Sequence, residues 1–469
     1  MNSYKKLINN TFVFALGNLG TKLITFFLVP LYTYNLNTSE YGLTDLITTS
    51  VSLLMPIFTV SIFDAVLRFV MDKNYDKKVI LNNALIIMVL GFAVLLGVLP
   101  LFQQYLPFAN YLGYFFCLLF VQALQSGLGQ YIRAQGKVML FAVNGIINAL
   151  IILLASLLFL VWLDFGITGY LLSYIVGYTL SSLFLIIRGE VWKDISLKNV
   201  DLHISKEMIQ YSIPLMPNSF MWWVINSANR YVITGFLGLS ANGIFAVASK
   251  IPSLLNVVYS IFFQAWQMSA IEEYESKDKS KFYSNVFNVF SFLMFLATSV
   301  ILLLLKILIS ILAEKSYFEA WKYVPFLLLG IVFSSFAGFL GTNYIAAKKT
   351  GGVFKTSVIG AIVNIVILLL LVPRIGINGA AIATMVSFFT IWILRVQDTK
   401  EYAEIRINWR KLILNLIVIF VQIGVLYLEL KLNYILQSIL VFLLCLVNNK
   451  EIKQIIELIQ LIIVKRRKN

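Results

Sequence analysis

Runs of about 20 apolar residues recur along this 469-residue chain, separated by short polar segments. In lipid every backbone N–H and C=O must be paired within the protein, so a run of this length crosses a bilayer as a helix. The runs therefore predict an all-α polytopic membrane protein with about fourteen transmembrane helices. They lie near residues 11–32, 42–67, 79–100, 109–131, 140–163, 166–187, 210–238, 242–270, 282–305, 323–346, 353–372, 377–394, 412–428 and 433–447.

The composition agrees with a membrane protein and excludes several other classes. Hydrophobic residues make up 60% of the chain and charged residues 13%, which is too apolar for a soluble core of this length. The formal net charge of +15 does not indicate nucleic acid, because the basic residues lie between hydrophobic spans rather than on one soluble face. Two cysteines, both in predicted spans, and one histidine give no disulfide framework and no metal cluster.

The distribution of lysine and arginine predicts the orientation of the chain. Most of the 37 basic residues fall on one side of the predicted spans, so both termini are expected to be cytoplasmic. The first apolar run, 11–32, lacks a cleavage site of small residues and is expected to remain as a signal anchor. Residues 449–469 place polar side chains on one stripe and end in a basic cluster, which predicts an amphipathic cytoplasmic tail on anionic lipid.

Short matches at a spacing of about 200 residues predict two six-helix copies with the same orientation. Ser39 to Gly42 matches Ser240 to Gly243, Gly166 to Gly169 matches Gly376 to Gly379, and Asn148 matches Asn364. The expected domains are an N-terminal lobe, a cytoplasmic linker, a C-terminal lobe, two additional transmembrane helices and the tail. Their ranges are 1–190, 191–209, 210–396, 397–448 and 449–469.

Three cations fall inside predicted spans, where each costs about 2.5–3.5 kcal/mol on insertion scales. Lys22 lies in the first span, whereas Arg230 and Lys250 lie on the two arms of a predicted hairpin, 226–252, joined by a turn from Gly238 to Gly243. Such residues face a partner or a wet cavity, so we interpret them as the floor of an anion site; snorkelling to a headgroup is the alternative. Asp45, near the outer end of the second span, is the nearest acid to balance them, although an interfacial position explains it equally well.

Asp64 and Arg68 lie four residues apart near the cytoplasmic end of the second span, so they share a helix face. The spacing predicts an ion pair that either gates the cytoplasmic side or only orients the helix. Pro56 and Pro252 lie inside predicted helices and act there as hinges or as static kinks.

These residues resemble the polysaccharide flippases of the MOP (multidrug/oligosaccharidyl-lipid/polysaccharide) superfamily. The likeness rests on Leu36 to Gly42 (LNTSEYG), Asp64 to Phe69 (DAVLRF), Asn229-Arg230-Tyr231 and Gly243 to Pro252 (GIFAVASKIP). The resemblance implies a MATE-like fold of two lobes that alternate access, and transport of undecaprenyl-diphosphate-linked oligosaccharide from the inner to the outer leaflet of the bacterial cytoplasmic membrane. It also implies a cation at Lys250. Asn229 departs from the family, in which Asp-Arg is common, so the neutralisation of Arg230 is open.

The expected function is thus a flippase for surface polysaccharide precursors, and not an enzyme. Its substrate-binding residues are Lys22, Asn229, Arg230 and Lys250. Expected partners are the lipid-diphosphate-linked oligosaccharide, anionic lipids at the cytoplasmic face, and a polysaccharide polymerase and glycosyltransferases; no cofactor is expected, although coupling to an ion or to membrane potential stays open.

Three alternative functions remain. The lipid II (peptidoglycan precursor) flippase is the nearest. A multidrug or cation antiporter of the same superfamily needs acidic groups in its cavity, whereas the mid-span charges here are cationic. A membrane glycan polymerase or ligase needs a larger external loop or an acid/base constellation than this chain offers.

Overall fold

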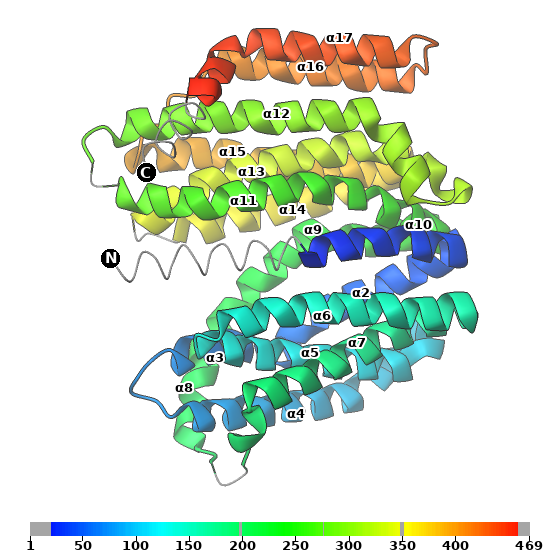
Figure 1. Cartoon of the computed structure of the whole chain (residues 1–469), viewed down its shortest axis with the longest axis vertical. Coiled ribbons are helices and arrows are strands. Elements are labelled where there is room, and N and C mark those ends of the chain that lie inside the picture. Colours follow the sequence, from blue (N-terminus) through cyan, green and yellow to red (C-terminus); the bar gives the residue numbers. More distant parts are fainter. Residues whose placement is uncertain (1–19, 197–198, 275, 348–350, 458–469) are drawn as a thin grey trace, which may run out of the picture. The chain divides into compact units, whose positions relative to one another are not determined.

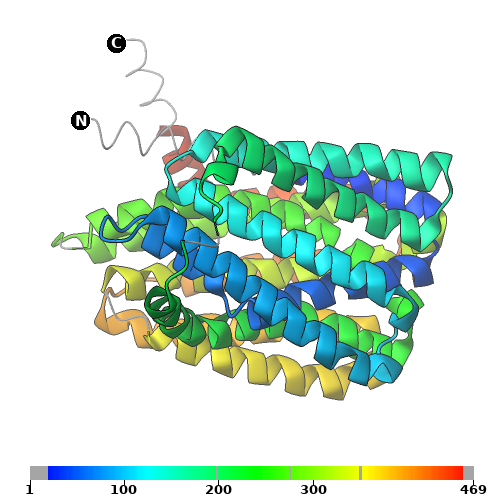
Figure 2. The same cartoon turned by 90° about the horizontal axis from the view of Figure 1, so that it is seen from below.

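Helices account for every regular element that the computed structural model describes, which comprises residues 20–196, 199–274, 276–347 and 351–457. A helix over residues 20–35 comes first. The α-helices that follow are α2 (Thr38–Phe58), α3 (Ile62–Val70), α4 (Lys77–Val98), α5 (Leu112–Ala134), α6 (Val138–Ser156), α7 (Gly166–Gly189), α8 (Leu202–Ser212), α9 (Met216–Leu237), α10 (Leu239–Ala248), α11 (Lys250–Glu272), α12 (Lys279–Leu312), α13 (Val324–Ala346), α14 (Gly351–Ile375), α15 (Ile377–Asp398), α16 (Trp409–Tyr427) and α17 (Asn433–Val447). Many of the long helices, such as α12, α16 and α17, run along a common direction, whereas α9 runs obliquely (Figure 1, Figure 2).

The described helices confirm an all-α polytopic membrane protein. Eleven of them are long and apolar enough to cross a membrane, and a twelfth span follows if α17 and the helix Asn449–Glu457 count as one span bent by 71°. The two other expected spans have separate explanations. The span 11–32 begins outside the described residues. The helix α9 is 22 residues long, but its polar side chains make its mean hydropathy too low for a candidate membrane span.

The contacts divide the chain into two units. The first unit comprises residues 1–246 with Leu312–Tyr317, and the second comprises Val247–Ile311 with Phe318–Asn469. The division therefore runs through α10 rather than through the predicted linker, 191–209. The predicted lobes are two copies of one sequence pattern, and a division by contacts does not test them. Their boundaries therefore stay a prediction.

Two helices predicted as continuous are interrupted. The span predicted at 42–67 becomes α2 and α3, because Pro56 lacks an N–H and the chain turns at Val60 and Ser61, both with positive φ. The span predicted at 242–270 becomes α10 and α11, with the break at Ser249. Pro252 lies in the first turn of α11, where its missing N–H costs no helical bond.

The predicted hairpin turn is tighter than expected. Gly238 alone links α9 to α10, with φ of 87°, a left-handed region that only glycine enters freely. Gly243 therefore lies inside α10 and not in the turn, and it is buried.

The matched sequences at 166–169 and 376–379 each begin at a glycine with positive φ where a helix starts. Gly166 is the first residue of α7 and has φ of 52°, and Gly376 lies immediately before α15 and has φ of 65°. The fourth residues of the two motifs, Gly169 and Gly379, pack against the backbone of the preceding helix. A Cβ there would lie 2.8 Å from the Phe159 carbonyl oxygen and 2.6 Å from the Leu371 carbonyl carbon, respectively. The duplication itself stays a prediction.

The segment after α7 is fastened to α4 by two consecutive asparagines. Asn82 donates to the Asp194 carbonyl (2.8 Å) and accepts from the Ser196 N–H (2.8 Å). Asn83 donates to the Asp201 carbonyl (2.9 Å) and accepts from the Asp201 N–H (3.1 Å). Because both asparagines are buried, these bonds pair polar groups that would otherwise be unsatisfied. They also hold the start of α8 against α4.

In the second unit, α16 and α17 form an antiparallel hairpin beside α12 (Figure 1). Buried amides join them, since Gln422 of α16 donates to Gln437 of α17 (3.0 Å) and accepts from Ser299 of α12 (2.8 Å). The predicted amphipathic tail begins in the helix Asn449–Glu457, and residues 458–469 lie outside the described part of the chain.

Candidate functional site

The start of α2 lies directly against the start of α10 in the first unit. α2 begins at a capping box, in which the Asn37 side chain accepts from the Ser39 and Glu40 N–H groups. A Cβ on Gly42 would lie 1.9 Å from the Leu239 carbonyl oxygen, and a Cβ on Gly243 would lie 1.9 Å from the Thr38 carbonyl oxygen. Only glycine permits this approach of two backbones. We call this pairing of Gly42 and Gly243 the glycine contact.

Polar side chains complete the glycine contact. The Thr38 and Ser240 hydroxyl oxygens are 2.8 Å apart, and both side chains are accessible. The buried Asn242 amide donates to the Gly42 carbonyl at 2.8 Å. The matched segments 39–42 and 240–243 therefore face each other.

One turn further along α2, an ion pair joins α2 to α9. The Arg230 Nε lies 2.7 Å from Asp45 Oδ2, and the two side chains are only 16% and 12% exposed. Arg230 Nη1 also donates to the Asn226 carbonyl of its own helix (3.2 Å), and the guanidinium carbon lies 5.7 Å from the centre of the Phe245 ring. A carboxylate and an aromatic face both stabilise a guanidinium in an apolar setting.

The ion pair uses only part of the Arg230 hydrogen-bonding capacity. A guanidinium has five N–H donors, and the contact with Asp45 is made by Nε alone rather than by the two-pronged fork. Within the described residues Nη2 donates to no protein acceptor. Arg230 is thus held in place while one edge stays available to a second anion.

Uncharged contacts continue along the same pair of helices. The Tyr231 and Ser50 hydroxyls are hydrogen-bonded, and the Trp223 indole N–H donates to the Thr49 carbonyl at 3.2 Å. These contacts and the ion pair lie within the first unit, so α2 and α9 form one polar-lined interface.

The other predicted binding residues take different positions. Asn229, beside Arg230 on α9, is 2% exposed. Lys22 is exposed on the 20–35 helix of the first unit and makes no ion pair with a described residue. Lys250 is partly exposed at the first position of α11 and belongs to the second unit. The structure brings Arg230 and Asp45 together and leaves the roles of Lys22, Asn229 and Lys250 as predictions.

The predicted ion pair between Asp64 and Arg68 is wrong. Both side chains are exposed on α3, and Arg68 instead lies 3.7 Å from Asp72, one turn further along the chain. α3 ends at Val70, so Asp72 lies in the following turn, where it stays within reach of the arginine. A gating role for Asp64 and Arg68 remains a prediction without this pair.

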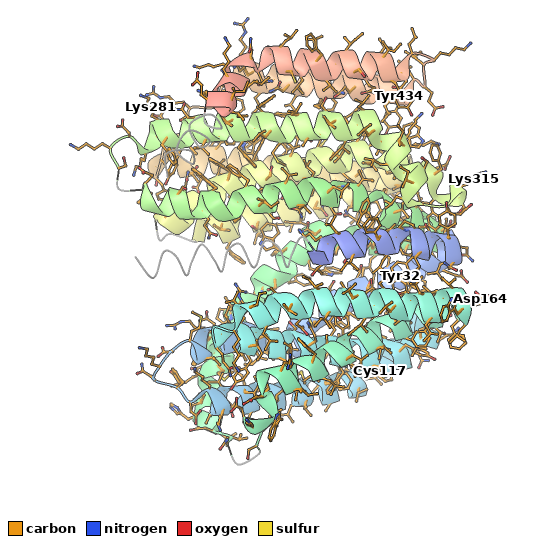
Figure 3. All side chains as sticks on the ribbon, in the orientation of Figure 1. Tyr32, Cys117, Asp164, Lys281, Lys315 and Tyr434 are labelled. Atoms are coloured by element: carbon orange, nitrogen blue, oxygen red, sulfur yellow. The ribbon has the colours of Figure 1, made fainter. Side chains whose placement is uncertain are left out.

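The structure contains a buried tyrosine cluster that the sequence did not predict. It links the 20–35 helix, the start of α2 and one face of α7, with ring centres 4.6 Å apart for Tyr32 and Tyr170 and 4.9 Å apart for Tyr170 and Tyr174. Tyr32 lies on the 20–35 helix (Figure 3) and its ring is 6.2 Å from that of Tyr41, four residues before Asp45. The i, i+4 spacing of Tyr170 and Tyr174 is a signal for one shared face, but it names no partner helix.

A buried arginine was not singled out from the sequence. Arg395 directly follows the span predicted at 377–394, and it is 3% exposed inside α15. It donates to the Ala337 carbonyl of α13 (2.8 Å) and to the Thr356 hydroxyl of α14 (3.1 Å). Arg395 therefore joins three helices of the second unit through neutral acceptors.

No group of three histidine, cysteine, aspartate or glutamate side chains converges in the part of the chain that the structure describes. Cys117 is exposed on α5 (Figure 3), and Cys445 lies on α17 in the second unit.

The fold is that of a multi-pass membrane protein of the MATE-like class. A solved structure of the lipid II flippase MurJ in an inward closed conformation covers 95% of this chain and 99% of its own, with a TM-score of 0.70 and 14% identity. An inward-facing multidrug resistance MATE family transporter of the MOP superfamily covers 83% of this chain and 98% of its own, with a TM-score of 0.67 and 13% identity.

The family follows from the sequence match. Residues 7–267, more than half of the chain, match the family model described as "polysaccharide biosynthesis protein", so the chain belongs to that family. An uncharacterized membrane protein of Methanocaldococcus jannaschii is 26% identical over 272 residues, or 54% of this chain. The match spans about half (53%) of that relative's length.

Proposed function

We propose that this protein is a flippase of the MOP superfamily. It carries an undecaprenyl-diphosphate-linked oligosaccharide from the inner to the outer leaflet of the bacterial cytoplasmic membrane, for surface polysaccharide biosynthesis. The observation that carries the proposal is Arg230, a cation held inside an apolar helix bundle by one carboxylate, with Nη2 left for another anion. A sugar diphosphate cannot enter hydrocarbon unless cations and donors replace its water. Arg230 supplies both a charge and a planar donor edge suited to phosphate.

Lys22 and Lys250 supply the further positive charge that a diphosphate requires. Lys22 lies on the 20–35 helix of the first unit and Lys250 at the start of α11 in the second. Asn229, next to Arg230, adds an amide suited to hydrogen bonding.

The nearest competing cargo within the superfamily is the peptidoglycan precursor, which carries the same kind of diphosphate. The likeness to MurJ, at 14% identity, supports the fold alone. Depletion in a bacterial host distinguishes the two cargoes, because loss of capsule or exopolysaccharide with intact cells agrees with our proposal, whereas lysis indicates the peptidoglycan precursor.

Complementation of a flippase-null strain tests the site. The triple variant Lys22→Gln, Arg230→Gln, Lys250→Gln should abolish surface polysaccharide. The two lysine changes each remove an insertion cost of about 2.5–3.5 kcal/mol. Arg230→Gln leaves Asp45 without its partner and lowers stability, so export is compared per copy of the protein in the membrane. The matched control is Lys315→Gln, Arg374→Gln, Lys431→Gln, which also removes three positive charges but outside the proposed site. Normal export by the first triple variant would show that these residues do not handle the cargo.

A further inference from the structure

We propose that Asp45 occupies the cargo's place on Arg230 in the empty transporter, and that the arriving diphosphate displaces it and thereby releases α2 from α9. The inference rests on the proposed function and adds a mechanism to it. Asp45 becomes a positioning residue whose carboxylate competes with the cargo, and the ion pair becomes the link between cargo binding and separation of the two helices.

The geometry of Arg230 allows such an exchange. Asp45 takes one N–H through a single contact of 2.7 Å, and Nη2 has no protein acceptor within the described residues. A phosphate can approach that edge before Asp45 leaves, so Arg230 need not pass through a state without an anionic partner. The Asn226 carbonyl and the Phe245 ring, both within the same unit, keep the guanidinium in place during the exchange.

The charges decide the direction of the exchange. A diphosphate carries more negative charge and more acceptor oxygens than a carboxylate, so it binds a guanidinium more strongly. Asp45 is 12% exposed and would lie beside that anion, where two like charges in a poorly screened setting repel each other. The incoming phosphate therefore destabilises the Asp45 contact that it replaces.

The ion pair lies next to the contacts that hold α2 against α10. Asp45 is one helical turn from Gly42. The other contacts described above are uncharged and join Thr38 to Ser240, the Asn242 amide to the Gly42 carbonyl, Ser50 to Tyr231, and Trp223 to the Thr49 carbonyl. The glycine contact tolerates no side-chain volume, so it holds only while the backbones stay in register. Loss of the one charged contact therefore weakens a closely fitted interface.

A cross-link between α2 and α10 reports the separation of α2 from α9, because Gly238 alone links α9 to α10. Cysteines at Thr38 and Ser240, where the hydroxyl oxygens are 2.8 Å apart, should form a disulfide rapidly in a background that carries Cys117→Ser and Cys445→Ser. In purified protein in nanodiscs, geranylgeranyl diphosphate should slow disulfide formation about tenfold, and geranylgeraniol, which lacks the diphosphate, should not. An unchanged rate with the diphosphate would overturn the coupling, and this arm requires no substitution at Asp45.

Substitutions at the pair separate the inference from the function on which it rests. Asp45→Asn should bind geranylgeranyl diphosphate about tenfold more tightly, because Arg230 has lost its competing anion. The same variant should cross-link slowly without ligand, because α2 has lost its charged contact with α9. Arg230→Lys should cross-link normally but lose the response to diphosphate, because a lysine can hold Asp45 yet offers no second planar edge. Asp164→Asn is the matched control, since it removes one carboxylate from the exposed turn that precedes α7 (Figure 3).

Two outcomes are decisive. If Arg230→Gln loses affinity for the diphosphate but Asp45→Asn leaves affinity and cross-linking unchanged, Asp45 is only structural, and the inference fails while the proposed function stands. If Lys22→Gln, Arg230→Gln and Lys250→Gln together keep full affinity, the anion binds elsewhere and the proposed function fails as well.

Discussion

At the scale of single residues, Arg230 and Asp45 are each costly in an apolar helix and tolerable as a pair. Removal of one partner from a fully buried pair costs about 3–5 kcal/mol, because the other charge is left uncompensated. The 16% and 12% exposure of these two side chains reduces that cost. The pair therefore places a cation in the bundle and leaves the cation ready to accept another anion.

A double-mutant cycle tests this coupling. We expect Asp45→Asn to destabilise the protein by about 1–3 kcal/mol, and the double variant Asp45→Asn, Arg230→Gln to be more stable than that single variant, because no buried charge is left unpaired. The measurement is thermal or denaturant unfolding in detergent. Additive effects of the two substitutions would show that the 2.7 Å contact contributes no coupling energy.

Substitutions at Lys250 should separate stability from export. Lys250 is the first residue of α11, where a positive charge opposes the helix dipole, so Lys250→Glu should stabilise the helix by about 0.3–1 kcal/mol. The same variant should abolish export, because it puts a like charge beside the diphosphate. Lys250→Arg should keep most of the activity. Complementation with protein abundance measured in parallel tests this series, and export by Lys250→Glu would contradict the anion site.

At the scale of elements, the glycine contact fixes how closely α2 approaches α10. Gly42→Ala and Gly243→Ala each place a Cβ within 1.9 Å of a carbonyl oxygen, so the backbones must move apart. We expect both variants to slow the Thr38–Ser240 cross-link severalfold and to lower stability by about 1–3 kcal/mol, as overpacking does.

Gly97→Ala in α4 is the control for the two alanine variants, because a Cβ there meets no atom within 4 Å. It should leave the cross-link unchanged and favour the helix by up to about 1 kcal/mol. Equal cross-linking rates in Gly42→Ala and Gly97→Ala would mean that the glycine contact does not determine the helix separation.

At the scale of the whole molecule, the prediction concerns orientation in the membrane. The excess of lysine and arginine predicts that the segment 188–206 is cytoplasmic and that residues 306–322 are external. Single cysteines at Asn199 and Ser316, in a variant without Cys117 and Cys445, should react differently with a membrane-impermeant thiol reagent on intact cells. Position 316 should be labelled and position 199 protected; the reverse pattern would invert the predicted direction of transport.

The sequence by itself determined the class of fold and the cations of the candidate site. Run length determines which segments can span a bilayer, because the hydrocarbon thickness is fixed and backbone groups must be paired within each helix. A charge inside such a run is visible without a structure, because its insertion cost requires a reason, and Arg230 was found in that way.

Only the tertiary structure decided what surrounds those cations. Asp45 lies 185 residues from Arg230, and an acid near the end of a span is equally compatible with an interfacial position, so the 2.7 Å contact depended on the packing of α2 against α9. The glycine contact and the tyrosine cluster were hidden for the same reason, since periodicity identifies a helix face but not the helix that covers it. Arg68 had two acids within one turn, and the chain path after α3 selected Asp72. Local pattern specifies each helix, whereas contacts between distant segments are fixed only when the helices pack.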